Sequence, residues 1–344
     1  MRSAWLLPLL ALLACQSPPE VRHRVQPSFY HWQSALALTE LETARMDSLG
    51  VEAVYLRYFD LDWSESYQQV VPVAVLTVAE PWDPKRAVIP TVFITNRSLT
   101  RPDLALDTLA HRMAAKIERI SRELGQPPIQ QLQIDCDWTE RSREAYFQLL
   151  EHLRTHFPQV LFSATIRLHQ IKYPERTGVP PVDRGMLMFY NVDDVADPTT
   201  QNSILDWPVA EAYLGRLPDY PLDLDLALPI FAWGAVFREG RLLRLLNNLR
   251  RSDLRDSTRF RSGEVGWVEL SKSTYLQGHY LYRGDRIRLE AVTREDLLGV
   301  VRQLRPLLRN NDLHLAFYHL DTTTLKHYPH ADLQDIVQSL SAAH

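Results

Sequence analysis

Short apolar runs rich in β-branched residues alternate with helical patterns along most of the chain. A parallel sheet with crossover helices produces this alternation, because its strands are buried on both faces and its helices on one. We expect eight strands, at 28–33, 52–60, 88–96, 129–137, 160–168, 185–191, 225–233 and 312–319. Eight parallel strands can close into a barrel, so the predicted fold class is an α/β (β/α)8 TIM barrel.

An open, doubly wound α/β sheet would give a similar alternation and is the alternative at this point. Such sheets commonly bind a dinucleotide at a Gly-x-Gly-x-x-Gly turn after the first strand. No such turn follows residues 28–33. A dinucleotide is therefore not expected, and the sequence predicts no other cofactor.

Capping residues indicate where the intervening helices begin and end. A Thr followed three residues later by an acidic residue begins a helix, and a glycine commonly ends one. These signals predict a helix between Thr39 and Gly50, one from about 103 to Gly125, one from Thr139 to before Pro158, one opening at Thr293 and a last one near 331–342.

Two segments depart from the alternation. Residues 70–76, after the second strand, have the character of an extra strand. Residues 239–292, after the seventh strand, are too long for one crossover. Residues 280–289 alternate about a Gly-Asp turn, which predicts a hairpin. The arginine-rich stretch 238–261 predicts the solvent-exposed face of a helix. We interpret these segments as insertions into a single domain, residues 27–344.

The N-terminal residues have the pattern of a secretory signal, with a basic residue, an apolar stretch and a small residue before a cysteine. Leu12-Leu13-Ala14-Cys15 resembles the lipobox of bacterial lipoproteins. The resemblance implies a signal peptide at 1–14, lipidation of Cys15 and a tether at 15–26. It also implies a cell-envelope location, at the outer membrane of a Gram-negative host because Gln16 follows the cysteine. An ordinary signal peptide with an incidental cysteine is the alternative.

Composition narrows the classes of partner. The chain has two cysteines, so lipidation of Cys15 leaves Cys136 without a disulfide partner, and we expect Cys136 to be buried. With 38 basic and 42 acidic residues, the net charge of −4 gives no electrostatic case for nucleic acid. The partners expected are a carbohydrate and, through the lipid, a membrane.

Polar and aromatic residues gather at the carboxyl ends of the predicted strands, which is where TIM barrels hold their active sites. The clearest candidate for a functional site is at the end of the fourth strand, where Asp135 and Asp137 flank Cys136. Side chains alternate across a strand, so the aspartates share one face and the cysteine lies on the other. If the aspartates face the barrel mouth, the thiol faces the helix layer.

Two carboxyl groups about 7 Å apart along a strand influence each other's charge. If the mouth of the barrel is partly shielded from water, one carboxyl group can stay protonated while the other is ionised, as general acid catalysis requires. Alternatively, both aspartates only pair with Arg57 or Arg167 and order the end of the barrel. No metal is expected, because no His-x-His or His-Glu-x-x-His spacing is present to complete a coordination sphere.

The end of the fourth strand resembles that of the chitinase-like glycoside hydrolase barrels, whose motif is Asp-x-x-Asp-x-Asp-x-Glu. The last two aspartates of this motif align with Asp135 and Asp137. The first aspartate of the motif then aligns with Leu132, and its catalytic glutamate aligns with Thr139. Glu140 is one residue too far and on the opposite face. The resemblance implies a glycoside hydrolase-like barrel, and the missing glutamate puts chitinase activity specifically in doubt.

The sixth strand strengthens this resemblance, because Met188-Phe189-Tyr190-Asn191 is similar to the family's Met-x-Tyr-Asp. Tyr190 matches the tyrosine, and Asn191 replaces the aspartate. The mature chain is also similar to an uncharacterised family of bacterial TIM-barrel proteins of unknown function, many of them lipoproteins. That family has an Ile-Asp-x-Asp fourth strand and a second strand like residues 55–60, and it implies no reaction.

We expect a glycoside hydrolase-like envelope lipoprotein that acts on a polysaccharide, with Asp137 as proton donor, Asp135 tuning it and Tyr190 orienting the substrate. Aromatic rings suit sugars, because a pyranose has an apolar face and a polar rim. The residues expected to bind the substrate are Trp32, Arg57, Tyr58, Asp60, Arg167, Asn191, Trp233, His319 and Asp321. The competing hypothesis, favoured by Thr139, is an inactive barrel that binds glycan or has a scaffolding role.

Overall fold

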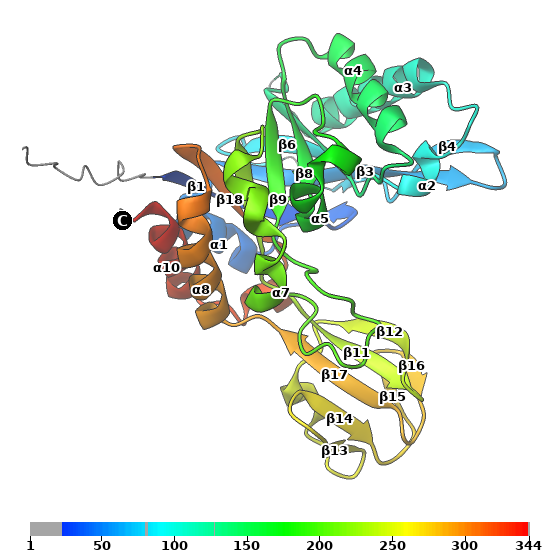
Figure 1. Ribbon diagram of the computed structural model, residues 1–344, viewed down its shortest axis with the longest axis vertical. Coiled ribbons are helices and arrows are strands. Elements are labelled where there is room, and N and C mark those ends of the chain that lie inside the picture. Colours follow the sequence, from blue (N-terminus) through cyan, green and yellow to red (C-terminus); the bar gives the residue numbers. More distant parts are fainter. Residues whose placement is uncertain (1–22, 80–81, 127, 343–344) are drawn as a thin grey trace, which may run out of the picture.

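The computed structural model describes residues 23–79, 82–126 and 128–342 (Figure 1). Eight parallel strands form its centre: β1 (Arg24–His31), β3 (Ala53–Ser64), β6 (Ala87–Ile94), β7 (Gln131–Cys136), β8 (Leu161–Ile166), β9 (Arg184–Met188), β10 (Leu224–Pro229) and β18 (Asp312–Tyr318). β1 pairs with both β3 and β18, so the sheet closes on itself. The TIM-barrel prediction is confirmed, and the open doubly wound sheet is excluded.

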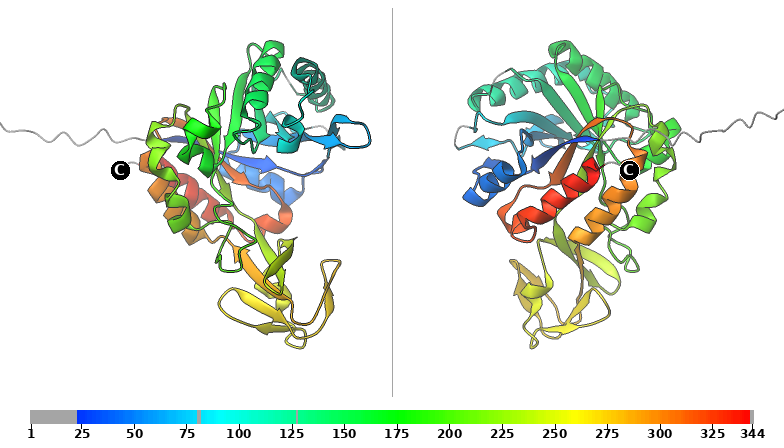
Figure 2. Two further views of the ribbon diagram at one scale, coloured as in Figure 1. Left: turned by 45° about the vertical axis from the view of Figure 1, so that its right-hand side comes forward. Right: turned by 90° about the vertical axis from the view of Figure 1, so that its left-hand side faces the viewer.

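Helices surround this barrel (Figure 2). They are α1 (Glu40–Leu49), α2 (Asn96–Leu99), α3 (Leu106–Glu123), α4 (Arg143–His156), α5 (Leu168–Lys172), α6 (Pro174–Thr177), α7 (Trp207–Glu211), α8 (Arg294–Leu304), α9 (Thr322–Leu325) and α10 (His330–Ser341), with short 3-10 turns η1 (Leu214–Asp219) and η3 (Arg305–Leu307). The helices α3, α4, α8 and α10 each bury one apolar stripe, as α3 does with Leu109, Met113 and Ile117.

The predicted helix caps at α1 and α8 are confirmed. Thr39 and Glu42 form a reciprocal capping box at the start of α1, and Gly50 ends that helix in the left-handed region at φ 65°. Thr293 and Asp296 form the same box at α8. These are local interactions, so their residue spacing was sufficient to predict them.

The extra strand after the second barrel strand is confirmed as β4 (Gln69–Val73), which pairs antiparallel with the far end of β3. Beside it, β5 (Thr77–Val78) pairs with β2 (Ala35–Leu36). These strands extend the barrel wall at its rim and do not enter its interior.

A second sheet projects from one side of the barrel between β10 and α8 (Figure 1). We call residues 232–291 the insertion. It contains β11 (Ala232–Arg238), β12 (Arg241–Asn247), η2 (Arg251–Leu254), β13 (Phe260–Ser262), β14 (Trp267–Leu270), β15 (Thr274–Leu276), β16 (His279–Leu281) and β17 (Arg286–Ala291). A small core of its own, including Val236, Leu246 and Ile287, stabilises the sheet ordered β12-β11-β17-β14-β13.

Two predictions within the insertion were wrong. Residues 280–289 are not one hairpin, because β16 pairs with β15 while β17 pairs with β11 and β14. The hairpin turn is instead Gln277-Gly278, where φ is 49° and 78°, the two positive values that a tight two-residue turn requires. The arginine-rich stretch 238–261 forms β12, the short 3-10 helix η2 and the start of β13 instead of an α-helix, because β11 and β14 provide edges with which β12 and β13 pair.

Polar side chains as well as apolar ones fill the barrel interior. The Tyr30 hydroxyl donates to Gln133 Oε1 at 2.6 Å, and Gln133 Nε2 donates to Ser163 Oγ at 3.3 Å. The Tyr30 and Tyr55 rings stack with centroids 4.9 Å apart, and the Tyr55 hydroxyl is 2.8 Å from His314 Nδ1. Because these buried groups satisfy one another, they form a fixed layer beneath the strand ends.

The predicted signal peptide and lipidated Cys15 lie outside the described residues. Residues 24–26, which were expected in the tether, form the beginning of β1. No helix in the described part of the chain is both long and apolar enough to cross a membrane.

Candidate functional site

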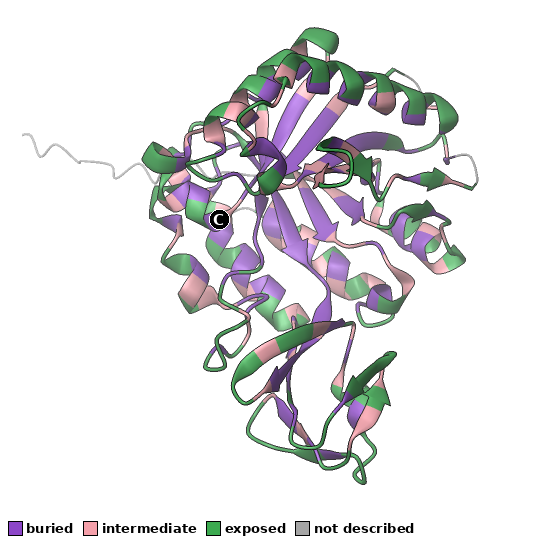
Figure 3. Cartoon of the chain, turned by 90° about the vertical axis from the view of Figure 1, so that its right-hand side faces the viewer, coloured by how far each residue is buried: buried purple, intermediate pink, exposed green. Residues whose placement is uncertain are grey.

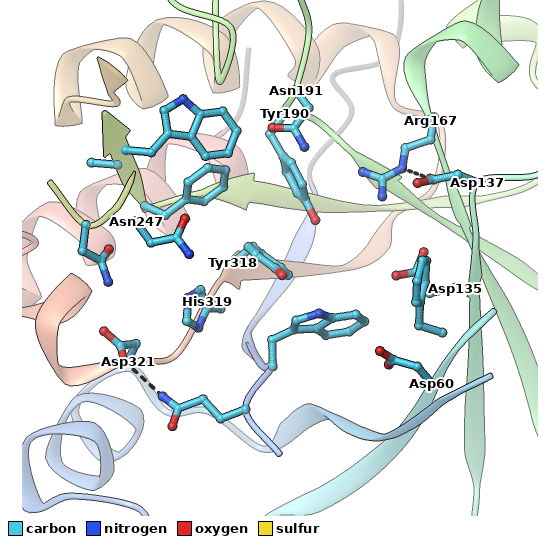
Figure 4. A pocket seen from close by; sticks show the side chains of 17 residues that line it. Asp60, Asp135, Asp137, Arg167, Tyr190, Asn191, Asn247, Tyr318, His319 and Asp321 are labelled. Carbon is cyan, nitrogen blue, oxygen red and sulfur yellow. Dashed lines mark hydrogen bonds and ion pairs between the residues drawn. The ribbon is translucent and has the colours of Figure 1, made fainter. Parts of the chain in front are cut away.

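The barrel strands are largely buried along their length (Figure 3). A cavity of about 700 Å³ opens at their carboxyl ends (Figure 4). Its volume lies in the range typical of sites for small molecules or short segments of polymer. The residues that line it are Trp32, Gln33, Asp60, Phe93, Asp135, Asp137, Arg167, Tyr190, Asn191, Phe231, Ala232, Trp233, Asn247, Asn248, Tyr318, His319 and Asp321. Most side chains expected from the sequence are therefore brought together here, and Arg57 and Tyr58 are the exceptions.

Asp135 lies at the inner end of the cavity on β7. It is 3% exposed, and Thr165 Oγ1 donates a 2.6 Å hydrogen bond to its Oδ1. Burial raises the pKa of Asp135 to about 6, although the charge of Arg167 lowers it by more than the charge of Asp137 raises it. This carboxyl group can therefore hold a proton close to neutral pH.

Asp137, two residues further on, is in a different environment. Its side chain is about half exposed, and its Oδ1 accepts a hydrogen bond from Arg167 Nε in an ion pair (Figure 4). Burial opposes the charge of Arg167, but the nearby Asp137 and Asp135 carboxylates raise its pKa overall. The aspartates on one strand face are thus split into a buried carboxyl and a half-exposed carboxylate paired with arginine.

Cys136 lies on the other face of β7, as the alternation of side chains requires. It has no exposed surface and does not line the cavity. The expected burial of this thiol is confirmed, and so is the expectation that both flanking aspartates face the mouth of the barrel.

A β-bulge in β3 explains why Tyr58 is absent from the cavity. The pairing of β3 with β6 shifts between Arg57 and Phe59, so Tyr58 is an extra residue in the strand. Its side chain is fully buried, and its hydroxyl lies 2.9 Å from Ser121 Oγ on α3. Tyr58 therefore belongs to the contact between strand and helix, and the expectation that it stacks on a sugar is corrected.

The same bulge places Arg57 and Asp60 on one face of β3, although strict alternation would separate them. Their side chains form an ion pair, with Arg57 Nε 2.6 Å from Asp60 Oδ1. Arg57 also donates to the Trp32 carbonyl at 3.1 Å, and its guanidinium lies 5.4 Å from the centre of the Trp32 ring. Arg57 thus orients two cavity residues from behind and does not line the cavity itself.

Aromatic rings form a continuous side of the cavity. Tyr318 is central, with ring centroids 5.2 Å from Tyr190, 5.8 Å from Trp32 and 5.9 Å from Phe231. Phe231 in turn lies 5.2 Å from Trp233. Interlocked rings of this kind present a rigid apolar surface beside the carboxyl groups.

The insertion supplies part of the cavity that sequence reasoning missed. Asn247 is the last residue of β12 and Asn248 follows it, and Asn247 pairs in register with Trp233 on β11. No pattern in the sequence connects these amides with the strand ends. Phe231 and Tyr318 were detectable in principle, because both stand at the ends of predicted barrel strands.

His319, at the end of β18, is mostly buried, and its Nδ1 has no hydrogen-bond partner. Burial lowers its pKa, so the ring is neutral at pH 7. On the same side of the cavity, Gln33 Nε2 donates to Asp321 Oδ2 at 3.0 Å (Figure 4). These groups offer neutral and charged hydrogen-bonding atoms opposite Asp135.

The glutamate that chitinase-like barrels carry after this strand has no counterpart in the cavity. Thr139 accepts the Arg143 N–H at 2.9 Å through its carbonyl group and so precedes α4, whose N-cap is Ser142 rather than the predicted Thr139. Glu140 is exposed and pairs with Arg176 at 3.4 Å, away from the cavity. The carboxyl groups that line the cavity therefore all belong to aspartates.

A buried ion pair holds the loop that follows Tyr190. Arg288 and Glu290, on β17, are 1% and 0% exposed and lie 2.7 Å apart. Arg288 donates to the carbonyls of Val195 and Asp197 at 2.9 and 2.7 Å, and Glu290 accepts the Ser203 N–H at 2.6 Å. The insertion thereby fixes the loop that begins with Asn191.

Among the described residues, no group of three or more His, Cys, Asp or Glu side chains is placed to hold a metal ion. The histidines near the C-terminus are separated, since His314 lies in the barrel interior, 3.0 Å from Gln26 Oε1, while His319 lies at the cavity.

No family model matches the chain, and no curated protein matches it in sequence. Solved structures match its fold. SleL, a spore cortex-lytic enzyme of Bacillus cereus, superposes with a TM-score of 0.56 at 10% identity, over 93% of this chain and 75% of that chain. SleL of Bacillus megaterium superposes with a TM-score of 0.55 at 10% identity, over 95% of this chain and 76% of that chain.

A chitinase from Chromobacterium violaceum gives a TM-score of 0.53 at 10% identity, over 92% of this chain and 99% of that chain. The likeness to chitinase-like barrels that the sequence predicted is confirmed at the level of fold. Identities this low show the fold alone, and the chain is thus a TIM barrel with a glycoside hydrolase-like fold.

Proposed function

We propose that this protein is an envelope lipoprotein that hydrolyses a polysaccharide, with Asp135 and Asp137 as its acid and base. The observation that carries the proposal is the buried Asp135 carboxyl group, with its pKa raised to about 6, in an aromatic-sided cavity at the strand ends. A cavity with this combination suits a sugar ring, which needs apolar surface and hydrogen-bonding groups together. Comparison with a chitinase and cortex-lytic enzymes supports the same class of substrate.

In the proposed reaction, protonated Asp135 donates its proton to the glycosidic oxygen as the bond between that oxygen and the anomeric carbon breaks. A water molecule forms the new bond to the anomeric carbon, and its proton passes to the Asp137 carboxylate. Arg167 keeps Asp137 oriented, and Tyr190, whose ring lies 5.6 Å from the Arg167 guanidinium, orients the sugar. These roles reverse the sequence expectation, in which Asp137 was the donor.

The test is release of reducing ends from purified peptidoglycan, chitin and other polysaccharides by wild-type protein and by Asp137→Asn. We expect turnover on at least one polymer and a loss of about 10²-fold or more in the variant, the usual contribution of a positioned acid or base. Glu140→Gln is the matched control, because Glu140 is a nearby carboxylate outside the cavity. Equal activity of Asp137→Asn and wild type would exclude the proposed role.

The second candidate is a barrel that binds glycan without cleaving it. Two observations favour it, namely the ion pair that ties Asp137 to Arg167 and the position of Thr139 outside the cavity. This candidate predicts that wild-type protein sediments with a polysaccharide but releases no reducing ends. Binding without turnover on every polysaccharide tested would identify the protein as a glycan-binding barrel and not as a hydrolase.

Anchoring through Cys15 is the remaining part of the proposal, and it is supported by the Leu12-Leu13-Ala14-Cys15 motif alone. In cells fed radiolabelled palmitate, the full chain is expected to incorporate label and to enter the membrane fraction. Cys15→Ala should lose both properties, whereas Cys136→Ala should keep both because that thiol is buried in the barrel wall. Labelling of the Cys15→Ala variant would disprove lipidation at this site.

A further inference from the structure

Three tyrosines of the insertion form an exposed aromatic strip. Tyr275, Tyr280 and Tyr282 are 70%, 46% and 53% exposed. Their rings contact one another in series, with centroids 5.0 Å apart for Tyr275 and Tyr280 and 5.1 Å apart for Tyr280 and Tyr282. Isolated exposed aromatics are common on protein surfaces, but a contiguous row of three indicates a place where something binds.

The strip is held in place by buried neighbours. Leu281, between two of the tyrosines, is 1% exposed and belongs to the core of the insertion, so the strand cannot rotate to bury the rings. The Tyr282 N–H donates to Asp285 Oδ2 at 2.8 Å, and Asp285 also pairs with Arg238 at 2.7 Å. The Arg238 guanidinium covers one face of Tyr282 at 4.5 Å. The rings are therefore displayed on a rigid support.

The hairpin that carries Tyr275 and Tyr280 contacts a residue of the cavity wall. Tyr275 and Tyr280 face each other across the β15–β16 hairpin, whose turn begins at Gln277. Gln277 Nε2 donates to the Asn247 carbonyl at 3.0 Å, and Asn247 lines the cavity beside Trp233. The end of the hairpin thus contacts the wall of the cavity, and the hairpin belongs to the insertion that projects from the barrel (Figure 1).

We propose that Tyr275, Tyr280 and Tyr282 form an outer subsite that binds the part of a glycan chain extending beyond the cavity. This inference rests on the proposed function, and it adds that the substrate is a long chain rather than a short oligosaccharide. Tyrosine rings offer faces on which sugar rings stack, and their hydroxyl groups bond to the sugar rim. The contact between Gln277 and Asn247 places the hairpin next to the proposed glycan site, and this proximity favours a glycan over an unrelated partner.

The test compares a polymer with a disaccharide. Tyr282→Ala and the triple variant Tyr275→Ala/Tyr280→Ala/Tyr282→Ala are measured for sedimentation with insoluble chitin and peptidoglycan sacculi, and for affinity for the N-acetylglucosamine disaccharide. We expect polymer affinity to fall about twofold to tenfold for each ring removed, while the ratio of polymer to disaccharide affinity falls in parallel. Tyr282→Ala retains the cross-strand pair, so it remains informative if the triple variant unfolds.

Tyr67→Ala is the matched control, because Tyr67 is 72% exposed and lies between β3 and β4, outside the insertion. Unchanged polymer affinity in both strip variants would overturn the inference and leave the proposed function intact. Wild-type protein that binds neither probe would overturn both. A dimer of wild-type protein that Tyr282→Ala dissociates would also overturn the inference, since the strip would then bind a second copy of this chain.

Discussion

The Asp135→Asn variant is expected to lose turnover by about 10²- to 10⁴-fold, the range that a positioned general acid contributes. Asparagine keeps the size of the side chain and can still accept the Thr165 hydrogen bond, but it has no proton to give. In wild-type protein, kcat/KM is expected to fall as pH rises above about 6, because the proton leaves Asp135 there. Reducing-end assays between pH 4 and 9 measure both effects.

The same variant is expected to be more stable than wild type at neutral pH. The folded protein raises the pKa of Asp135 from 3.8 to about 6, so the protonated carboxyl is favoured on folding. The stabilisation that this protonated carboxyl group contributes is fully present below about pH 4 and is lost as pH rises through 6. Asparagine does not titrate, so the variant avoids this loss in the free energy of unfolding, which amounts to at most about 3 kcal/mol.

Thermal unfolding at pH 4 and pH 7.5 checks this linkage, with Asp183→Asn as the control because Asp183 is a partly exposed carboxylate outside the cavity. A gain in the Tm of Asp135→Asn at pH 7.5 that disappears at pH 4 is the expected result. Equal turnover of variant and wild type would remove Asp135 from the mechanism, whatever the effect on stability.

The second large effect is expected at the buried ion pair of the insertion. Arg288→Met leaves Glu290 buried without its cation and removes two hydrogen bonds to loop carbonyls. Breaking such a pair from one side costs about 3–5 kcal/mol. The loop that begins with Asn191 should loosen as well, so substrate affinity is expected to fall together with the free energy of unfolding.

Urea unfolding and binding to chitin measure the two effects. Arg261→Met is the matched control, since Arg261 belongs to the same sheet but forms an exposed pair with Glu269. Exposed pairs contribute about 1 kcal/mol or less. An Arg288→Met variant as stable as Arg261→Met would show that the pair does not hold the loop.

The barrel could be predicted from the sequence because its signals are local and repeated. Apolar runs of strand length recur between amphipathic helices, and all eight predicted strands overlap observed barrel strands. The capping boxes at Thr39 and Thr293 depend on residues three apart, so spacing alone was sufficient. Alternation along β7 likewise predicted that Asp135 and Asp137 lie on the strand face opposite Cys136.

The insertion could not be predicted in the same way. Its strands pair with partners up to 59 residues away, as Ala232 of β11 does with Ala291 of β17, and neither propensity nor periodicity encodes that choice. The stretch 238–261 was therefore assigned to a helix, and the hairpin turn was placed at Gly284 rather than at Gln277-Gly278. The fit between Asn247 and the cavity wall depends on the same non-local pairing.

The sequence by itself determined the barrel, the clustering of polar residues at its strand ends and the shared face of the two aspartates, because each follows from a repeat of two or of about 3.6 residues. Only the tertiary structure decided how those groups differ. One added residue in β3 turned Tyr58 toward α3 and set Arg57 beside Asp60. Burial raised the pKa of Asp135 while Arg167 paired with Asp137. Such differences arise from neighbours distant in sequence, since solvent exclusion and ion pairing depend on what surrounds a side chain in space.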